Sequence, residues 1–254
     1  MRVVVTGSNG FIGKNLVEKL ITNPEIIGVQ CIDIKTQWDI RFIDRLVAIP
    51  DVIVHLAAEV SVFNEDHAKI VKTNIEGFMI VADYCRKHKI RLIYASSSSA
   101  NNITSMYGMS KKFNEEYATI YAPYSLGLRF HNVYGKHQRK DTLIGKILNE
   151  KKITLHNNGD NVRFFTHVND VVDCIEHHIF TSEVGVMNIC SKECYTTHDI
   201  VNFLRKYYNF SVQYVSEMRR HDRVYQKIED LLEWECKHND IDFNLKQLVE
   251  DHGK

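Results

Sequence analysis

Apolar and polar residues follow two different periods through the first half of the chain. Short runs rich in valine and isoleucine are typical of strands, and longer segments with an apolar residue at every third or fourth position are typical of helices. Strands are predicted at Arg2–Thr6, Ile26–Asp33, Thr36–Trp38, Asp51–Leu56, Ile90–Ala95 and Tyr124–Phe130. Helices are predicted at Gly10–Thr22, Arg41–Ile49, Asp66–His88 and Tyr107–Tyr121.

This alternation predicts an α/β fold. The run Asp51–Leu56 is largely apolar, which is typical of a strand that is buried on both faces of a parallel sheet. Parallel strands joined by helices require right-handed crossovers, so we expect a doubly wound parallel sheet of the Rossmann type.

The pattern becomes less regular after Gly135. Short helices are predicted at Thr142–Asn149, Asn169–Phe180, Thr197–Tyr207 and Tyr225–Glu235, and short strands near Ile153–His156 and Val186–Ile189. We therefore expect a Rossmann-type domain over residues 1–135 and a small C-terminal α/β substrate lobe over residues 136–254, part of it interleaved with the last strands of the sheet.

Composition narrows the function classes. The 254 residues are 44% hydrophobic and 25% charged, which is typical of a globular protein. Lys+Arg and Asp+Glu both number 32, so the sequence lacks the excess of basic residues that is typical of nucleic-acid-binding proteins. No apolar run is long enough for a membrane span, and the sequence after Met1 does not resemble a signal peptide, so a cytoplasmic protein is expected. The six cysteines lack metal-site spacing, so we expect reduced thiols and no metal.

A glycine-rich turn follows the first strand. Gly7 permits a tight turn, Gly10 leaves room for a pyrophosphate beside the backbone, and Gly13 lets the following helix pack closely on the strand. The helix N-terminus then offers N–H groups and a positive dipole end to phosphates. This strand, turn and helix predict a dinucleotide site.

Asp33 ends the second strand, twenty residues after Gly13. A carboxylate at this place accepts hydrogen bonds from the adenosine ribose hydroxyls and repels a 2′-phosphate, which favours NAD over NADP. Two alternatives remain at this point. Asp33 would also suit a turn at a strand end, and Lys35 would suit a 2′-phosphate.

A second group of polar residues follows the predicted strand Ile90–Ala95. Serines occupy positions 96–99, and Tyr107 and Lys111, four residues apart, share one face of a helix. We expect the Lys111 ammonium and a cationic nicotinamide to lower the pKa of the Tyr107 phenol from about 10 towards neutrality, which suits proton transfer to and from an alcohol.

These motifs resemble those of an extended short-chain dehydrogenase/reductase, in particular the NAD-dependent nucleotide-sugar epimerase/dehydratase family that includes UDP-glucose 4-epimerase. The likeness runs from Met1 to about Val249. It rests on TGSNGFIG (6–13), Asp39-Ile40, HLAAEVS (55–61), NIEG (74–77), YASSSS (94–99), YGMSK (107–111), LRFHNVYG (128–135), ITLHNNGDNVRFFTHVND (153–170) and HDRVY (221–225).

The resemblance implies roles for individual residues. It implies a catalytic set of Ser97, Tyr107 and Lys111, with Ser98 as the alternative to Ser97. It implies NAD contacts at Gly7, Asn9, Gly10, Phe11, Ile12, Gly13, Asp33, Asp39, Ile40, Leu56, Ala57, Ala58, Asn74, Tyr107 and Lys111. It implies contacts with a nucleotide-diphosphate sugar at Ser98, Asn132, Arg163 and Arg223, the two arginines holding the diphosphate. It also implies a homodimer formed through Asp66–His88 and Tyr107–Tyr121.

Departures from the family pattern bear on the reaction. The segments between Ser97 and Tyr107 and between Asp33 and Asp39 are short, so the substrate is small or the site open. Dehydratases of the family carry an Asp-Glu pair where this chain has Ser98 and Ser99, which favours reversible oxidation at C4 by a nucleotide-sugar 4-epimerase. The alternatives are an NAD(P)H-dependent 4-keto-sugar reductase and a nucleotide-sensing family member without turnover.

Overall fold

The computed structural model describes residues 1–36, 38–46, 48–220, 222–225 and 231–253. A parallel sheet of seven strands in the order β11-β8-β5-β4-β3-β1-β2 forms its centre. The strands are β1 Arg2–Thr6, β2 Gly28–Ile32, β3 Val52–His55, β4 Arg91–Ser97, β5 Ser125–Phe130, β8 Gly185–Ile189 and β11 Leu232–Glu233. The doubly wound parallel sheet predicted from the sequence is therefore confirmed.

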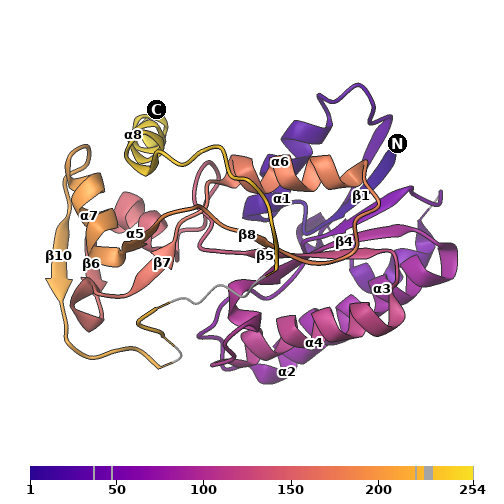
Figure 1. The fold of residues 1–254 in the computed structure, drawn as a ribbon, viewed down its shortest axis with the longest axis horizontal. Helices are drawn as coiled ribbons and strands as arrows, with labels where there is room; N and C mark the ends of the chain where they lie inside the picture. Colours follow the sequence, from indigo (N-terminus) through magenta and orange to yellow (C-terminus); the bar gives the residue numbers. More distant parts are fainter. Residues whose placement is uncertain (37, 47, 221, 226–230, 254) are drawn as a thin grey trace.

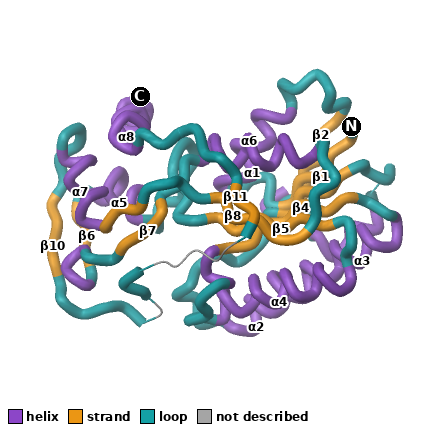
Figure 2. The backbone as a smooth tube through the Cα atoms, viewed as in Figure 1, coloured by secondary structure: helices purple, strands orange, loops and turns teal. Residues whose placement is uncertain are grey.

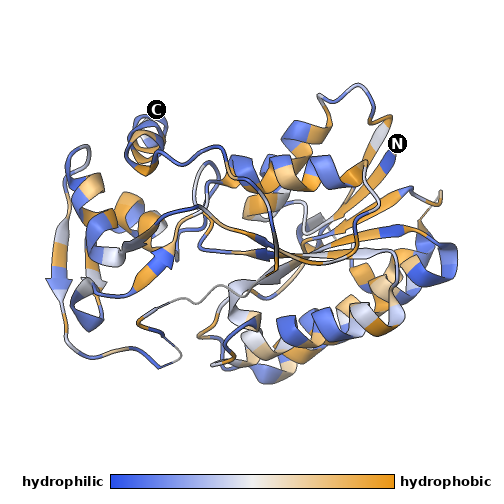
Figure 3. Cartoon of the chain, viewed as in Figure 1, coloured by the Kyte–Doolittle hydropathy of each residue, from blue (hydrophilic) through white to orange (hydrophobic). Residues whose placement is uncertain are grey.

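Helices cover both faces of this sheet (Figure 1). On one face lie α1 (Phe11–Leu20) and α6 (Val168–Ile179), whose apolar side chains share a core with β1, β3 and β5. On the other lie α3 (Gly77–His88) and α4 (Met106–Tyr121), which bury Phe78 and Ala118 against the sheet. Burial on both faces explains why apolar residues are frequent in these strands (Figure 3).

The smaller lobe has a core of its own. Figure 2 shows its helices and short strands gathered at one end of the sheet. Its elements are α5 Leu143–Glu150, β6 Lys152–Leu155, β7 Val162–Phe164, β9 Cys194–Thr196, α7 Thr197–Arg205, β10 Ser211–Tyr214 and α8 Ile241–His252. β6 pairs with β10 in parallel, and β7 pairs with β9 antiparallel. Strands β8 and β11 return from this part of the chain to the main sheet, so the expected interleaving is present. The domain boundary at residue 135 stays a prediction.

Some predicted elements differ from the structure. The strand expected at Thr36–Trp38 is absent in its described part, because Ile34–Thr36 forms a 3-10 turn closed on the Asp33 carbonyl. The helix expected at Arg41–Ile49 is a 3-10 segment over Ile40–Arg45.

The prediction of a helix at Tyr225–Glu235 is also wrong for the residues of this range that the structure describes. Leu232–Glu233 pairs with β8 as a strand, and residues 226–230 lie outside the described residues. The helix expected at Asp66–His88 is one run made of α2 (His67–Ile70), a π-helical segment (Val71–Glu76) and α3. Among the described residues no helix is long and apolar enough to cross a bilayer.

Candidate active site

A cavity of about 1000 Å³ opens at the carboxyl ends of the sheet strands, between the sheet and the smaller lobe. Ligands of open parallel sheets bind at this edge, because every loop that follows a strand lies there. Nearly all the predicted site residues line the cavity. They are Gly7, Gly10, Phe11, Ile12, Gly13, Asp33, Asp39, Ile40, Leu56, Ala57, Ala58, Ser97, Ser98, Tyr107, Lys111, Asn132, Arg163 and Arg223.

The glycine turn has the geometry that a bound pyrophosphate requires. Gly7 has φ +69°, and a Cβ there would lie 2.7 Å from the Ala57 backbone nitrogen. A Cβ on Gly13 would lie 2.2 Å from the Gly7 carbonyl oxygen. The first turn of α1 contains no acidic residue, and its N-cap, Gly10, provides no side-chain hydrogen bond. The N–H groups of this helix start therefore suit an anion.

Asp33 lines the cavity next to the glycine turn. Its carboxylate accepts hydrogen bonds from the backbone N–H groups of Asn9 (2.9 Å) and Lys35 (2.9 Å). Asp33 lines the cavity, whereas Asn9, which was predicted to contact NAD, does not. The backbone N–H of Asn9 is hydrogen-bonded to Asp33 instead.

Asn74 does not line the cavity either, contrary to the expectation of a cofactor contact. It is 1% exposed. Its amide accepts a hydrogen bond from the Glu59 N–H (2.8 Å) and donates to the Glu59 carbonyl (2.9 Å) and the Ser110 hydroxyl (3.0 Å). Asn74 therefore links the loop after β3 to α4. The asparagine of the NIEG motif thus has a structural role in this chain.

The residues predicted to be catalytic meet where β4 ends and α4 begins. Tyr107 lies in the first turn of α4, and the Ser97 hydroxyl acts on its phenol so as to lower the pKa of the phenol. That hydroxyl also accepts the Ser99 N–H (3.1 Å), which fixes its orientation. A Cβ on Gly108 would lie 2.6 Å from the Ser99 carbonyl oxygen, so glycine lets the helix start this close to the strand end.

Lys111 contributes less to the phenol than expected. Its Nζ donates a hydrogen bond to the Ala95 carbonyl (2.8 Å) and lies 5.8 Å from the Tyr107 ring centre. Burial raises the pKa of Tyr107, and the Ser97 hydrogen bond and the Arg139 charge lower it in part. Burial also lowers the pKa of Lys111 to about 8. The protein groups alone therefore do not bring the pKa of Tyr107 below its ordinary value.

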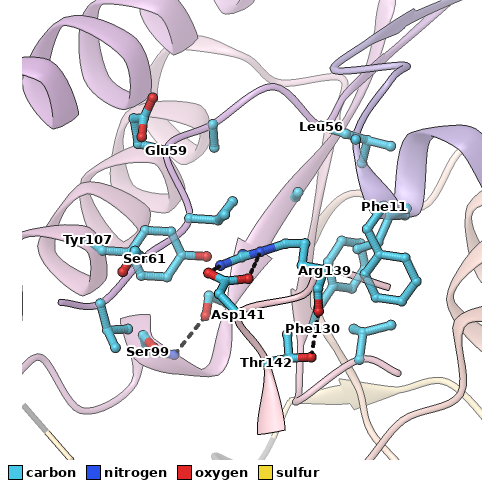
Figure 4. Close-up of a pocket in the computed structure, with 18 of the residues that line it drawn as sticks. Phe11, Leu56, Glu59, Ser61, Ser99, Tyr107, Phe130, Arg139, Asp141 and Thr142 are labelled. Atoms are coloured by element: carbon cyan, nitrogen blue, oxygen red, sulfur yellow. Dashed lines mark hydrogen bonds and ion pairs between the residues drawn. The ribbon is translucent and has the colours of Figure 1, made fainter. Parts of the chain in front are cut away.

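Arg139 and Asp141 form a part of the site that the sequence reasoning missed. The Arg139 guanidinium donates two hydrogen bonds to the Asp141 carboxylate, one of them at 2.9 Å. Figure 4 shows this pair in front of the Tyr107 phenol. The only local signal is the Arg-Lys-Asp sequence that follows the LRFHNVYG motif.

Arg163 and Arg223 lie on the smaller lobe's side of the cavity. Arg163, on β7, contacts Asp222 at 2.5 Å and is 15% exposed. Asp222 also accepts hydrogen bonds from the Arg223 N–H (3.0 Å) and the Arg219 guanidinium (3.4 Å). Burial and the neighbouring Arg163 lower the pKa of Arg223. Three arginines thus meet around one carboxylate; His221 of the same motif lies outside the described residues.

Residues 3–190 match the model of the family described as the NAD dependent epimerase/dehydratase family. The chain belongs to this family. Membership confirms the predicted resemblance, and it confirms the prediction of an enzyme with NAD as its cofactor, because the family is NAD-dependent.

Known relatives agree with this assignment. Protein CapI of Staphylococcus aureus is 32% identical over 228 residues, which cover 69% of this chain and 68% of that protein. The dTDP-glucose 4,6-dehydratase of Mycolicibacterium smegmatis is 23% identical over 306 residues, which cover 98% of this chain and 92% of that protein. That alignment is longer than the 254 residues of this chain, so the dehydratase has segments that this chain lacks.

A solved structure shows the same fold. The UDP-glucose 4-epimerase of Thermotoga maritima, determined with UDP-glucose, superposes with a TM-score of 0.86 at 24% identity. The superposition covers 98% of each chain, so the family fold is kept from end to end.

Proposed function

We propose that the protein is an NAD-dependent epimerase that oxidises and re-reduces C4 of a nucleotide-diphosphate sugar. The observation that carries this proposal is that Ser97, Tyr107 and Lys111 line one cavity together with the glycine turn at one end and Arg163 at the other. A hydroxyl held by serine and tyrosine between a dinucleotide and a diphosphate site suits a sugar alcohol.

The residues that line the cavity fit NAD. The glycine turn would hold the pyrophosphate, Asp33 the adenosine ribose, and Lys111 the nicotinamide ribose. When bound, NAD supplies the hydride acceptor and a positive ring that favours the Tyr107 phenolate.

The side chains of the protein then carry the proton. Tyr107 accepts the proton of the C4 hydroxyl during oxidation and returns a proton to the C4 oxygen during reduction. Ser97 hydrogen-bonds the same oxygen. Arg163 and Arg223 bind the diphosphate with charge-assisted hydrogen bonds, which leaves the sugar ring free to present either face.

The acidic residues of the cavity favour epimerisation over dehydration. Elimination of water requires a carboxylic acid that can hold a proton, and the described acids lining the cavity all have donor partners. These acids are Asp33, Asp39, Glu59, Asp141 and Asp222. For example, Arg139 holds the pKa of Asp141 below its usual range, and Arg41 does the same for Asp39.

The substrate class follows from the arginines and the relatives. Structural neighbours were determined with UDP-glucose and with UDP-glucuronic acid. We therefore include UDP sugars of both kinds in the test.

Isotopic labelling tests the reaction. Each UDP sugar, with deuterium at C4, is incubated with the protein and followed by NMR; the expected product is the C4 epimer with its deuterium retained. Deuterium that appears in free NADH would instead indicate a ketoreductase, and a 4-keto-6-deoxy product a dehydratase. If no product forms and the nucleotide sugar still binds, the sensing alternative is correct.

We also propose a homodimer through the outer faces of α3 and α4. Exposed apolar side chains on α4 suit such an interface, among them Met109, Phe113, Ile120 and Tyr121. Light scattering of the protein and of an Ile120→Asp variant tests this, because a dimer through α4 weakens in the variant. A cytoplasmic location stays a prediction.

A further inference from the structure

Three consecutive residues at the end of β4 are each tied to α4. The Ala95 carbonyl accepts the hydrogen bond of Lys111, and the Ser97 hydroxyl lowers the pKa of the Tyr107 phenol. Ser96 lies between them and makes its own contact with the helix. The two catalytic contacts therefore enclose a third contact that takes no part in the proposed chemistry.

This third contact is the centre of a buried ion pair. The Ser96 hydroxyl donates to Glu115 Oε1 (2.5 Å), and the Arg129 guanidinium donates to both oxygens of Glu115 (2.7 and 2.6 Å). The Glu115 and Arg129 side chains are each 3% exposed. Ser96 and Arg129 are paired in the register of β4 and β5, so their side chains leave the sheet on the same face, towards α4.

A buried ion pair of this kind contributes little net stability. Removing two charges from water costs about as much as their attraction returns, and apolar pairs of similar size are often equally stable. The pair instead fixes an orientation, because the Arg129 guanidinium and the Ser96 hydroxyl both donate hydrogen bonds to Glu115 and hold its carboxylate in one geometry. Glu115, one helical turn after Lys111, thus fixes the position of α4 along the strands of the sheet.

We infer that Glu115 is a positioning residue, which with Arg129 and Ser96 holds α4 where the Tyr107 phenol reaches Ser97. The inference rests on the proposed function for its activity readout. Without this link we expect α4 to shift along β4, and we expect the shift to move the Tyr107 phenol away from the Ser97 hydroxyl.

The charged and titratable groups around the catalytic pair are few. Lys111 faces Glu115 and, from β3, His55, whose pKa burial lowers to about 3, so that it is neutral. Tyr107 faces Arg139. Replacing both members of the Glu115–Arg129 pair leaves the net charge unchanged, so a change in the titration of Tyr107 then reports mainly its hydrogen bond.

The test is the double variant Glu115→Leu/Arg129→Met in the NAD-loaded protein. We expect a melting temperature close to that of the parent, a kcat lower by about 10- to 100-fold, and a KM for the nucleotide sugar within about twofold, because a displacement near 1 Å affects chemistry more than binding. We also expect the pKa of Tyr107, followed by NMR of ¹³C-labelled tyrosine against Tyr107→Phe, to rise as the Ser97 hydrogen bond weakens. The control is Lys19→Gln/Asp173→Asn, which removes an ion pair between α1 and α6 (2.8 Å) and is expected to leave the melting temperature, kcat, KM and the Tyr107 pKa unchanged.

A folded double variant with the kcat and the Tyr107 pKa of the parent overturns the inference. If the double variant does not fold, Ser96→Ala removes only the link to β4. A smaller loss of kcat and a raised Tyr107 pKa in that variant support the inference, and unchanged values overturn it. If the parent itself epimerises no nucleotide sugar, the proposed function fails, and the Tyr107 pKa still decides the positioning role.

Discussion

Tyr107 and Lys111 lie one turn apart on α4, yet the ammonium is bonded to a carbonyl of β4 and lies 5.8 Å from the phenol ring. The residues that lower the pKa of the Tyr107 phenol are Ser97 and Arg139 instead. We therefore expect the two residues to have separable roles: Tyr107 to carry the proton, and Lys111 to contribute charge from a fixed place beside the cofactor site.

Replacing Tyr107 with phenylalanine removes the proton carrier and keeps the ring. We expect turnover of the nucleotide sugar to fall by about 10²- to 10⁴-fold, with NAD affinity unchanged, because general acid–base catalysis contributes that much. Steady-state kinetics and calorimetric titration with NAD measure the two effects. Tyr121→Phe, an exposed position on the same helix, is the control. Turnover within threefold of the parent in the Tyr107 variant contradicts the assignment.

Lys111 makes stability depend on pH. Burial lowers its pKa from about 10.5 to about 8, so below pH 8 the folded state holds an ammonium that the unfolded chain solvates better, at a cost of roughly 3 kcal/mol. Lys111→Met is expected to raise the melting temperature at pH 7, and the gain is expected to shrink as the pH rises from 8 to 10.5. Melting curves between pH 6.5 and 10.5 measure it. A gain that grows with pH would contradict the sign.

Two buried histidines, His55 and His131, and the half-buried His167 make stability depend on pH in the acid range. Burial lowers the pKa of His55 to about 3, and that of His131 and His167 to about 4. The unfolded chain binds protons at these residues from about pH 6.5 downwards, so stability falls by roughly 1.4 kcal/mol per pH unit for each. The melting temperature is expected to drop between pH 7 and 5.5, and less steeply in His131→Gln. A flat profile over this range counts against neutral burial.

Gly7 and Gly28 form a matched pair of glycine positions. Gly7→Ala places a Cβ 2.7 Å from the Ala57 nitrogen at φ +69°, so we expect a loss of about 1–3 kcal/mol and a weaker affinity for NAD. No atom lies within 4 Å of a Cβ at Gly28, so Gly28→Ala is expected to change stability by less than about 0.5 kcal/mol. Equal effects at the two positions in chemical denaturation would show that the turn is not the constraint.

Arg163 is expected to bind the diphosphate. Arg163→Gln is predicted to weaken UDP binding by about 10- to 100-fold, because charge-assisted hydrogen bonds contribute about 1.5–3 kcal/mol, and to leave NAD binding unchanged. Calorimetric titration with UDP and with NAD separates the two sites. Arg86→Gln on the surface of α3 is the control. Parallel losses of both ligands would indicate misfolding of the cavity rather than a lost contact.

The sequence by itself determined the elements whose signals are local. The apolar runs specified β1, β3, β4 and β5, because a strand that is buried on both faces is mostly apolar. The glycines at 7, 10 and 13 specified a turn that no larger residue fits. The spacing of Tyr107 and Lys111 placed them on one helix face, because four residues make about one turn.

Only the tertiary structure decided what depends on distant segments and on burial. It brought Arg139 to the Tyr107 phenol, turned Asn74 inward to fasten a loop, and paired Leu232–Glu233 with β8 where the local pattern favoured a helix. It also raised the pKa of Tyr107 where the neighbouring lysine suggested the reverse. The physical reason is that desolvation and long-range pairing are set by how segments far apart in the chain pack together, and no local period records that packing.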